Sequence, residues 1–264
     1  MKYEIKTLSL GEILDQGIGL IRDKFGLLMG IMGLTVIPTQ IVMGVLSLQM
    51  PQPGQPGPPQ MPAPEMVFLL LGVLFLFLLV VLPLSNAAVV YAAARTYLGH
   101  STTLGACFGH ALRRLPALLW TSILMGFAIM GGLILFIIPG ILCAFWFMLA
   151  QQVTVLESMN GGAALSRSKA LMKGNMGTGF VLGLIIGVIN IGTNMVSQLI
   201  PQPFGMVVAS VVAGGMTLLS TCTFVVFYFS CRCMHDNFDL EVLANEVAGD
   251  AGDDAAEDRF ETVE

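Results

Sequence analysis

Amide side chains recur within apolar stretches in the second half of the chain. A polar group in such surroundings needs a hydrogen-bond partner. Asn190, Asn194 and Gln198 follow one another at intervals of four residues, so a helix places them on one face. Gln151 and Gln152 lie together near the end of the preceding apolar stretch. Inside a membrane such groups hydrogen-bond to other helices or line a path for a polar substrate. These five residues are a candidate polar membrane site, and structural hydrogen bonding between helices is the alternative.

Charged side chains surround a break between two apolar stretches, in the segment VLESMNGGAALSRSKALMKGN from residue 155 to 175. Glu157 precedes a pair of glycines, and Arg167 and Lys169 follow them. We expect Glu157 to form a cytoplasmic ion pair with Arg167 or Lys169, which would fix a short basic helix to the bundle. The apolar stretches carry no clearly central charge, which counts against a proton- or ion-coupled carrier.

The closest approach to metal-ligand spacing is the C-x-C-x-H pattern of Cys231, Cys233 and His235. Closed structural zinc sites use four ligands, so these three residues alone do not predict a metal site. The sequence also lacks Gly-x-Ser-x-Gly, His-Glu-x-x-His and P-loop motifs. We therefore expect a protein with no cofactor, no metal and no enzymatic activity.

A second helical stripe consists of small residues. Gly179, Gly183 and Gly187 form a G-x-x-x-G-x-x-x-G pattern. Glycines at this spacing allow another helix to approach closely within a membrane. The pattern predicts a packing surface, used either by a helix of the same chain or by a second copy in a homo-oligomer.

Composition indicates the class of protein that must position these residues. The chain has 264 residues, of which 55% are hydrophobic and 11% charged, and its mean hydropathy is +0.82. Soluble domains carry roughly 25% charged residues. A chain with so few polar groups cannot cover a water-exposed surface, so most of its surroundings must be membrane lipid. We expect an all-α integral membrane protein and no nucleic-acid partner.

The apolar stretches predict six transmembrane helices. A helix needs about 20 apolar residues to cross the hydrocarbon core. The run 117–156 has 40 residues, or about 60 Å of helix, so it must fold back once, and Pro139–Gly140 offers the tight turn. Residues 1–25 predict an amphipathic helix at the interface, with capping-box spacing of Ser9 and Glu12, and residues 103–115 predict a short basic helix. The predicted spans are 26–48, 66–91, 117–138, 141–156, 176–200 and 206–230.

The distribution of basic residues predicts the orientation. With six spans, all twelve Lys and Arg residues fall on one side of the membrane. The three loops on the other side, 49–65, 139–140 and 201–205, contain none. The positive-inside rule therefore places both termini in the cytoplasm, and we expect the bacterial cytoplasmic membrane.

Two parts of the chain differ in composition. Residues 1–235 form the predicted six-helix membrane domain, and residues 236–264 form an acidic cytoplasmic tail with eleven of the seventeen Asp and Glu residues. The end of this tail, 249–264, has the composition of disorder. The six predicted spans form three hairpins, and a similar segment precedes each hairpin. These segments are LSLGEILDQGIGLIRDKF, TTLGACFGHALRRL and MNGGAALSRSKALMKGN. The similarity predicts three repeated helix-hairpin units, each opened by an interfacial cytoplasmic helix.

The segment 155–175 resembles the bacterial membrane-domain family first described next to glycerophosphodiester phosphodiesterases. The residues that carry the resemblance are Val155-Leu156-Glu157, Gly161-Gly162, Arg167-Ser168 and Lys173-Gly174. The N-terminal LGEILDQGIGLIRDKFG is also similar to that family. In the final part of the chain, the matching residues are Tyr228, Arg232, Phe238, Asp239 and Leu240, whereas Cys231, Cys233 and Asn237 depart from the usual ending.

This resemblance implies six helices with cytoplasmic ends. It does not imply catalysis, because the phosphodiesterase of that family is a separate soluble domain, which we do not expect in this chain. The leading hypothesis is a non-enzymatic membrane module or scaffold of unknown biochemical activity, with cytoplasmic helices and an acidic tail that recruit a protein partner. The alternative is a transporter or lipid-handling protein that uses the polar face of the fifth span, and an intramembrane enzyme ranks third.

Overall fold

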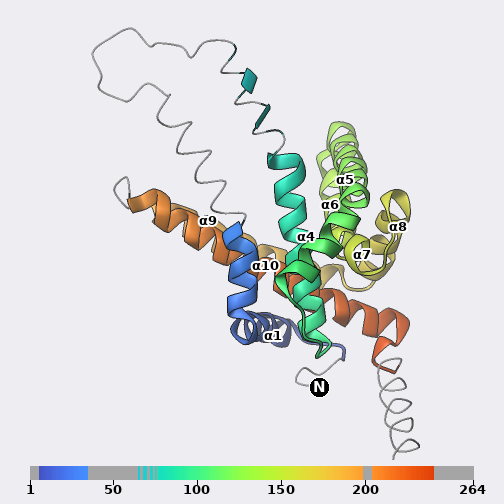
Figure 1. Cartoon of the computed structure of the whole chain (residues 1–264). Coiled ribbons are helices and arrows are strands. Elements are labelled where there is room, and N and C mark those ends of the chain that lie inside the picture. The colour runs from blue at the N-terminus through green and yellow to red at the C-terminus, as the bar shows by residue number, and fades with distance from the viewer. Residues whose placement is uncertain are drawn as a thin grey trace, which may run out of the picture.

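The computed structural model is built from helices (Figure 1). It describes residues 6–34, 65, 68–69, 72–73, 75, 77–198 and 204–240. Across these ranges the chain forms no β-strand. The helices that are long and apolar enough to cross a membrane are Leu79–Tyr97, Leu104–Leu135, Ile137–Leu156, Met176–Met195 and Val211–Asp236. The fold is therefore that of a helical integral membrane protein.

The chain enters the bundle through α1, Leu10–Asp23. The predicted capping box is present, because the backbone N–H of Ser9 donates to Oε2 of Glu12 over 2.8 Å. The hydrogen bonds from Ser9 also lower the pKa of the Glu12 carboxyl group. A turn at Lys24 leads into a short apolar helix, Phe25–Leu34. The rest of the predicted first span, 35–48, lies outside the described residues, so six spans remain a prediction.

A close crossing holds α1 against α10, Phe204–Asp236. A Cβ atom added to Gly17 would lie 2.7 Å from Oγ1 and 3.1 Å from Cα of Thr223. Ile13 and Leu20 flank Gly17 and are completely buried. The apolar face of the predicted interfacial helix thus packs against the bundle itself.

The central helix is α4, Leu82–Tyr97, which is preceded by a π-helical turn, η1, at Phe77–Val81. Pro83 lies in the first turn of α4 and cannot donate to a carbonyl in η1. A π-helical adjustment is one way in which a membrane helix satisfies the backbone groups that a proline frees. The residues 87–94 are mostly alanine and valine, and most of them are buried, so α4 can lie close to its neighbours.

The helix α5, Leu104–Leu135, differs from the prediction. The sequence suggests a basic helix over 103–115 and a separate span that begins after Pro116. Instead, one continuous helix includes Pro116 in its interior. Proline is tolerated inside membrane helices when the surrounding structure compensates for the lost hydrogen bond, so Pro116 does not end this helix.

The predicted reversal in the run 117–156 is present, but it occurs earlier than expected. Phe136 is extended, with φ −161° and ψ 147°, and separates α5 from α6, Ile137–Trp146. Pro139 falls in the first turn of α6, where a missing N–H costs least. Gly140 then allows the two helices to touch, because a Cβ added to Gly132 would lie 2.9 Å from the Cα of Gly140.

The remaining helices, from the fourth span to the end of α10, complete the bundle. An irregular turn at 147–149 joins α6 to α7, Ala150–Leu156, and together they form the fourth span. Next come α8, Gly161–Met172, and α9, Met176–Gln198. The last helix, α10, continues six residues beyond the predicted end of the sixth span at 230. Residues 241–264 of the predicted tail lie outside the described part of the chain, and the three-unit repeat stays a prediction.

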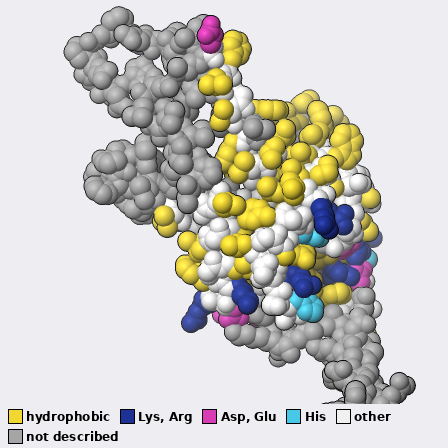
Figure 2. Space-filling model, viewed as in Figure 1, with side chains coloured by type: hydrophobic (Ala, Val, Ile, Leu, Met, Phe, Trp, Pro, Cys, Tyr) yellow, Lys and Arg dark blue, Asp and Glu magenta, His cyan; other side chains and the backbone are white. Residues whose placement is uncertain are grey.

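Exposed apolar side chains cover the end of the molecule where α5 meets α6 (Figure 2). Ile134, Phe136 and Ile138 are 73–80% exposed there. The largest completely buried side chains include Tyr97, Tyr228 and Leu149, on α4, on α10 and before α7. Water would oppose so large an exposed apolar surface, whereas lipid accommodates it.

Candidate functional site

A cavity of about 580 Å³ lies between α4, α5, α6, α7, α9 and α10 and opens to the outside of the bundle, where its lining residues Leu82, Ala144 and Thr217 are exposed. Small-molecule sites typically have volumes of about 300–1,000 Å³, so this one could hold a ligand. The lining residues are Leu82, Pro83, Asn86, Met125, Ile129, Ala144, Phe147, Met148, Gln151, Gln152, Asn190, Thr217, Ser220, Thr221 and Phe224. None of these residues is charged.

One polar part of the lining is a chain of hydrogen-bonded side chains that come from three helices. Oγ1 of Thr221 on α10 donates to Oδ1 of Asn86 on α4 over 3.2 Å. Nδ2 of Asn86 then donates to Oε1 of Gln151 on α7 over 2.6 Å. Two amides and a hydroxyl therefore connect three separate helices at the cavity wall.

Other polar side chains of the lining donate to the backbone of their own helix. Oγ1 of Thr217 donates to the carbonyl of Ala213 over 2.9 Å, and Oγ of Ser220 donates to that of Met216 over 2.7 Å. Nδ2 of Asn190 on α9 donates over 3.0 Å to the carbonyl oxygen four residues earlier. These bonds leave the hydroxyl oxygens and the Asn190 side-chain oxygen as acceptors, and the second N–H of Asn190 as a donor.

Gln152 is the unusual member of the lining. Only 6% of the residue is exposed, and its Oε1 has no hydrogen-bond partner. A buried acceptor without a partner costs about 1–3 kcal/mol. The terminal torsion of a glutamine is soft, so the amide can turn its oxygen toward a group inside the cavity. The unpaired oxygen of Gln152 can therefore accept a hydrogen bond from a bound molecule, and its amide N–H groups can donate one.

The other walls of the cavity are apolar. Met125 and Ile129 come from α5, Phe147 and Met148 from the turn before α7, and Phe224 from α10. Methionine side chains adapt their shape to irregular ligands. The cavity therefore combines an amide and hydroxyl surface with a deformable apolar surface, which is the arrangement that an amphiphile requires.

The cavity brings together three of the five residues proposed as a polar membrane site: Gln151, Gln152 and Asn190. Asn194 is exposed, and its Nδ2 donates to the backbone carbonyl of Asn190 over 2.8 Å, so it does not join them. The side chain of Gln198 lies outside the described part of the structure.

Sequence reasoning did not assign Asn86 and the α10 hydroxyls to the site. Thr217, Ser220 and Thr221 have the i, i+3, i+4 spacing of a polar helix face, which is the signal that could have identified them.

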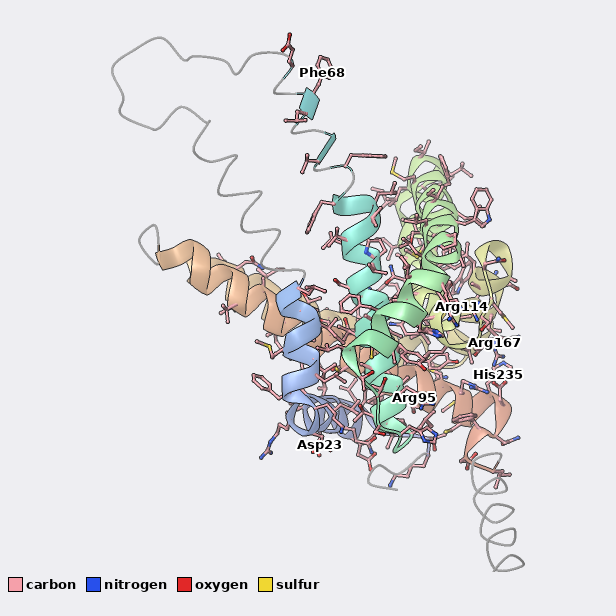
Figure 3. All side chains as sticks on the ribbon, in the orientation of Figure 1. Asp23, Phe68, Arg95, Arg114, Arg167 and His235 are labelled. Carbon is pink, nitrogen blue, oxygen red and sulfur yellow. The ribbon has the colours of Figure 1, made fainter. Side chains whose placement is uncertain are left out.

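A second polar cluster lies where α7, α8 and α10 meet (Figure 3). Of the two partners that the sequence offers to Glu157, the structure selects Arg167, whose Nε donates to Oε2 of Glu157 over 2.8 Å. The two terminal nitrogens of Arg167 donate to the carboxylate of Asp236. Arg232 adds contacts of 3.5 Å to Asp236 and 3.9 Å to Glu157. The hydroxyl of Tyr228 donates to Oε1 of Glu157 over 2.8 Å.

This ion cluster, Glu157, Arg167, Arg232 and Asp236, is electrically balanced. The four side chains are only 11–25% exposed. The hydrogen bond to Asp236 raises the pKa of Arg167, so that guanidinium stays charged. Paired charges at this depth fix the C-terminal ends of α7 and α10 to the middle of α8. The signal for it is the i, i+4, i+8 spacing of Tyr228, Arg232 and Asp236 on α10.

Lys169 points to a different partner. Its Nζ lies 4.0 Å from the ring centroid of Trp146 at the end of α6. Such a cation–π contact contributes about 0.5–1 kcal/mol at exposed sites. Next to it, Oγ of Ser168 donates to the carbonyl of Trp146 over 2.8 Å. The basic helix α8 is thus attached to α6 as well as to α10.

The break before α8 is held by α5. Thr121 accepts a hydrogen bond of 2.8 Å from the backbone N–H of Gly161. Nε2 of His110 lies 3.0 Å from the carbonyl oxygen of Val155, and Arg114 donates to the hydroxyl of Ser158. Gly161 itself has a φ of +52°, which glycine adopts without steric cost.

The glycine stripe of α9 contacts side chains of the same chain. A Cβ added to Gly179 would lie 2.7 Å from Cε of Met172, and one added to Gly183 would lie 3.3 Å from Cε of Met148. Gly187 has open space around it. At this stripe the close contacts are thus to flexible side-chain ends, not to the backbone of another helix.

The C-x-C-x-H pattern does not converge on one point. Cys231 and Cys233 are buried, whereas His235 is exposed and its Nδ1 lies 3.6 Å from Asp236. Within the described ranges, His, Cys, Asp and Glu form no group of three that could hold a metal ion.

Comparison with known protein families gives one match. A model for a domain of unknown function, DUF8558, matches residues 106–256. The chain belongs to the DUF8558 family. The matched residues include the whole ion cluster and all of the cavity lining except Leu82, Pro83 and Asn86 on α4. Neither the curated proteins nor the solved structures contain a match.

Proposed function

We propose that this DUF8558 protein is a lipid-handling membrane protein that takes an amphiphilic molecule into the cavity between α4 and α10. The observation that carries the proposal is a ligand-sized cavity whose lining includes Gln152, a residue with a buried and unpaired Oε1. The hydrogen-bonded amides beside Gln152 would hold the polar head of the amphiphile. The apolar part of the amphiphile would lie against the apolar wall that contains Met125, Ile129 and Phe224. The sequence suggested lipid handling as its alternative hypothesis, at the polar face of the fifth span. The present proposal moves the site to the cavity, which only Asn190 of that face lines.

The test is to fill the cavity and measure bound lipid. Ala144 lines the cavity and is exposed, so Ala144→Phe adds bulk there without displacing packed side chains. The matched control is Ile141→Phe, on the same helix, 49% exposed and outside the cavity lining. The purified full chain is analysed for co-purifying lipids by native mass spectrometry. We expect the bound lipid to be lost in Ala144→Phe and retained in Ile141→Phe. Equal lipid content in both variants and the wild type would reject the proposal.

The scaffold hypothesis remains a second proposal, supported by the position of Asp236. The acidic segment leaves α10 at this residue, and two arginines anchor it there. A truncation that tests partner recruitment must therefore begin after residue 240, so that the ion cluster is intact. Loss of a co-purifying protein on removal of 241–264 would favour recruitment by the tail, and unchanged partners would exclude it.

The orientation and the wider relationship are also proposals. We infer that both termini face the cytoplasm of a bacterial cell, because the basic residues are absent from the predicted outer loops. The resemblance to the membrane domains associated with glycerophosphodiester phosphodiesterases agrees with a non-enzymatic module. The involvement of Tyr228 and Arg232 in the ion cluster gives these two resembling positions a structural role.

A further inference from the structure

The hydrogen-bonding groups of the cavity favour one kind of ligand. The hydroxyl hydrogens of Thr217, Ser220 and Thr221 are all donated to protein acceptors, so these hydroxyls can only accept from a ligand. Asn190 spends an N–H on its own helix, which leaves its carbonyl oxygen as an acceptor. Gln152 adds an acceptor that has no partner. The second N–H groups of Asn86 and Asn190 and the amide N–H groups of Gln151 and Gln152 are donors in the same lining. A ligand group that both donates and accepts hydrogen bonds therefore matches this lining.

The absence of charged side chains from the cavity lining restricts the class of ligand further. Among the described residues, no Asp, Glu, Lys or Arg lines the cavity. A charged headgroup would be buried there without a counter-ion, which is expensive in a region of low dielectric. Hydroxyl groups donate and accept hydrogen bonds and carry no charge. The charges of the ion cluster at Glu157 are balanced among themselves.

We propose that the cavity binds an uncharged lipid whose small headgroup carries free hydroxyls, of the monoacylglycerol type. This inference rests on the proposed function and specifies its ligand class. The hydroxyl groups of the lipid headgroup donate hydrogen bonds to Gln152 and to the acceptor oxygens of α9 and α10. The acyl chain lies along Met125, Ile129, Phe147, Met148 and Phe224.

The test uses three probes that share one acyl chain. They are monooleoylglycerol, its dimethyl ether, which lacks both hydroxyl donors, and oleate, which is anionic. Their affinities for the full chain are measured by native mass spectrometry in detergent. We expect monooleoylglycerol to bind more tightly than its ether by about fivefold or more, since each hydrogen bond contributes roughly that factor. We expect oleate to bind more weakly than monooleoylglycerol.

Gln152→Leu gives the decisive variant, because its effects on stability and on binding have opposite signs. Replacing an unpaired buried acceptor by an apolar side chain of similar size is neutral or stabilising. The ligand-free variant should therefore unfold at the same or a higher temperature than the wild type. Its preference for monooleoylglycerol over the ether should fall to about twofold or less. A purely structural role for Gln152 would instead lower the unfolding temperature.

Gln16→Leu is the matched control. Gln16 on α1 also has a buried Oε1 without a partner, but it lies outside the cavity lining. This variant should match Gln152→Leu in ligand-free stability and keep the wild-type preference among the probes. A loss of preference in Gln16→Leu would show that the effect does not arise in the cavity, and would overturn the assignment of Gln152.

The outcomes separate the ligand class from the proposed function. If monooleoylglycerol and its ether bind equally, or if oleate binds best, the cavity holds a lipid but not a hydroxyl donor, and the inference is wrong. If Ala144→Phe leaves the binding of all three probes unchanged, the cavity does not hold lipid and the proposed function fails as well. If sodium or potassium ions stabilise the wild type but not Gln152→Leu, the acceptors bind a cation, which also overturns the inference.

Discussion

At the scale of single residues, the two glycines that begin α8 have opposite roles. Gly161 has a φ of +52°, and a Cβ added there would lie 2.7 Å from the ring of Trp120. Gly162 is exposed and has no positive φ, and its nearest neighbour, Cδ2 of Leu124, would be 4.0 Å away. The pair therefore offers a substitution and its control at neighbouring positions.

We expect Gly161→Ala to lower the free energy of unfolding by about 1–3 kcal/mol, because alanine is strained at positive φ and would also displace Trp120. Gly162→Ala should be neutral or should raise it by about 0.4–1 kcal/mol, because alanine restricts the unfolded chain. The measurement is unfolding of both variants in detergent. Equal effects at the two positions would contradict the assigned backbone conformation.

The ion cluster predicts a strong coupling between Glu157 and Arg167. Arg167→Met leaves two carboxylates facing one arginine, whereas the double variant with Glu157→Gln restores the balance of charge. A double-mutant cycle should therefore give a coupling free energy of about 1–3 kcal/mol in unfolding experiments. Lys169→Met, which removes only the contact with Trp146, should couple to Glu157→Gln by much less. A coupling near zero for the first pair would mean that the two charges are not paired.

At the scale of elements, the crossing of α1 and α10 leaves no room for a side chain. Gly17→Ala places a methyl group against both Oγ1 and Cα of Thr223. We expect a loss of about 1–3 kcal/mol in the free energy of unfolding, the range for overpacked interiors. Gly11→Ala in the same helix meets no atom within 4 Å and should have no such cost. Equal stability of the two variants would show that α1 is not packed against α10.

The sequence predicted helices well where only hydropathy and length decide. It was less successful where a proline was the signal: Pro116 does not end a helix and Pro139 does not form the turn. A proline costs little when it falls in the first turn of a helix or when the surroundings compensate. Such compensation depends on three-dimensional neighbours, and these cannot be read from local sequence.

The candidate site was predictable only in part, for a similar reason. Periodicity along α9 indicated Asn190, and the amide pair before Glu157 indicated Gln151 and Gln152. Asn86 and Thr221 join them only because α4, α7 and α10 meet at one level of the bundle. No spacing within a single helix contains that information. The same applies to Asp236, which looked like the beginning of a tail and instead pairs with Arg167.

At the scale of the whole molecule, charge and apolar surface are segregated. Figure 2 shows Lys and Arg side chains gathered toward one end and hydrophobic side chains toward the end where α5 meets α6. The uneven distribution of basic residues along the sequence thus corresponds to a separation of basic and apolar surfaces in the structure. A chain with this distribution is expected to orient with its basic end in the cytoplasm.

Cysteine labelling tests this orientation. After the five native cysteines are replaced, a single cysteine is introduced at Ser101, which is exposed between α4 and α5, or at Gln55, which lies outside the described residues. The basic residues flank Ser101, so a membrane-impermeant maleimide should label Gln55→Cys and spare Ser101→Cys in intact cells. Permeabilised cells should show label at both. Labelling of Ser101→Cys but not Gln55→Cys before permeabilisation would reverse the orientation, and the ion cluster would then face the outside.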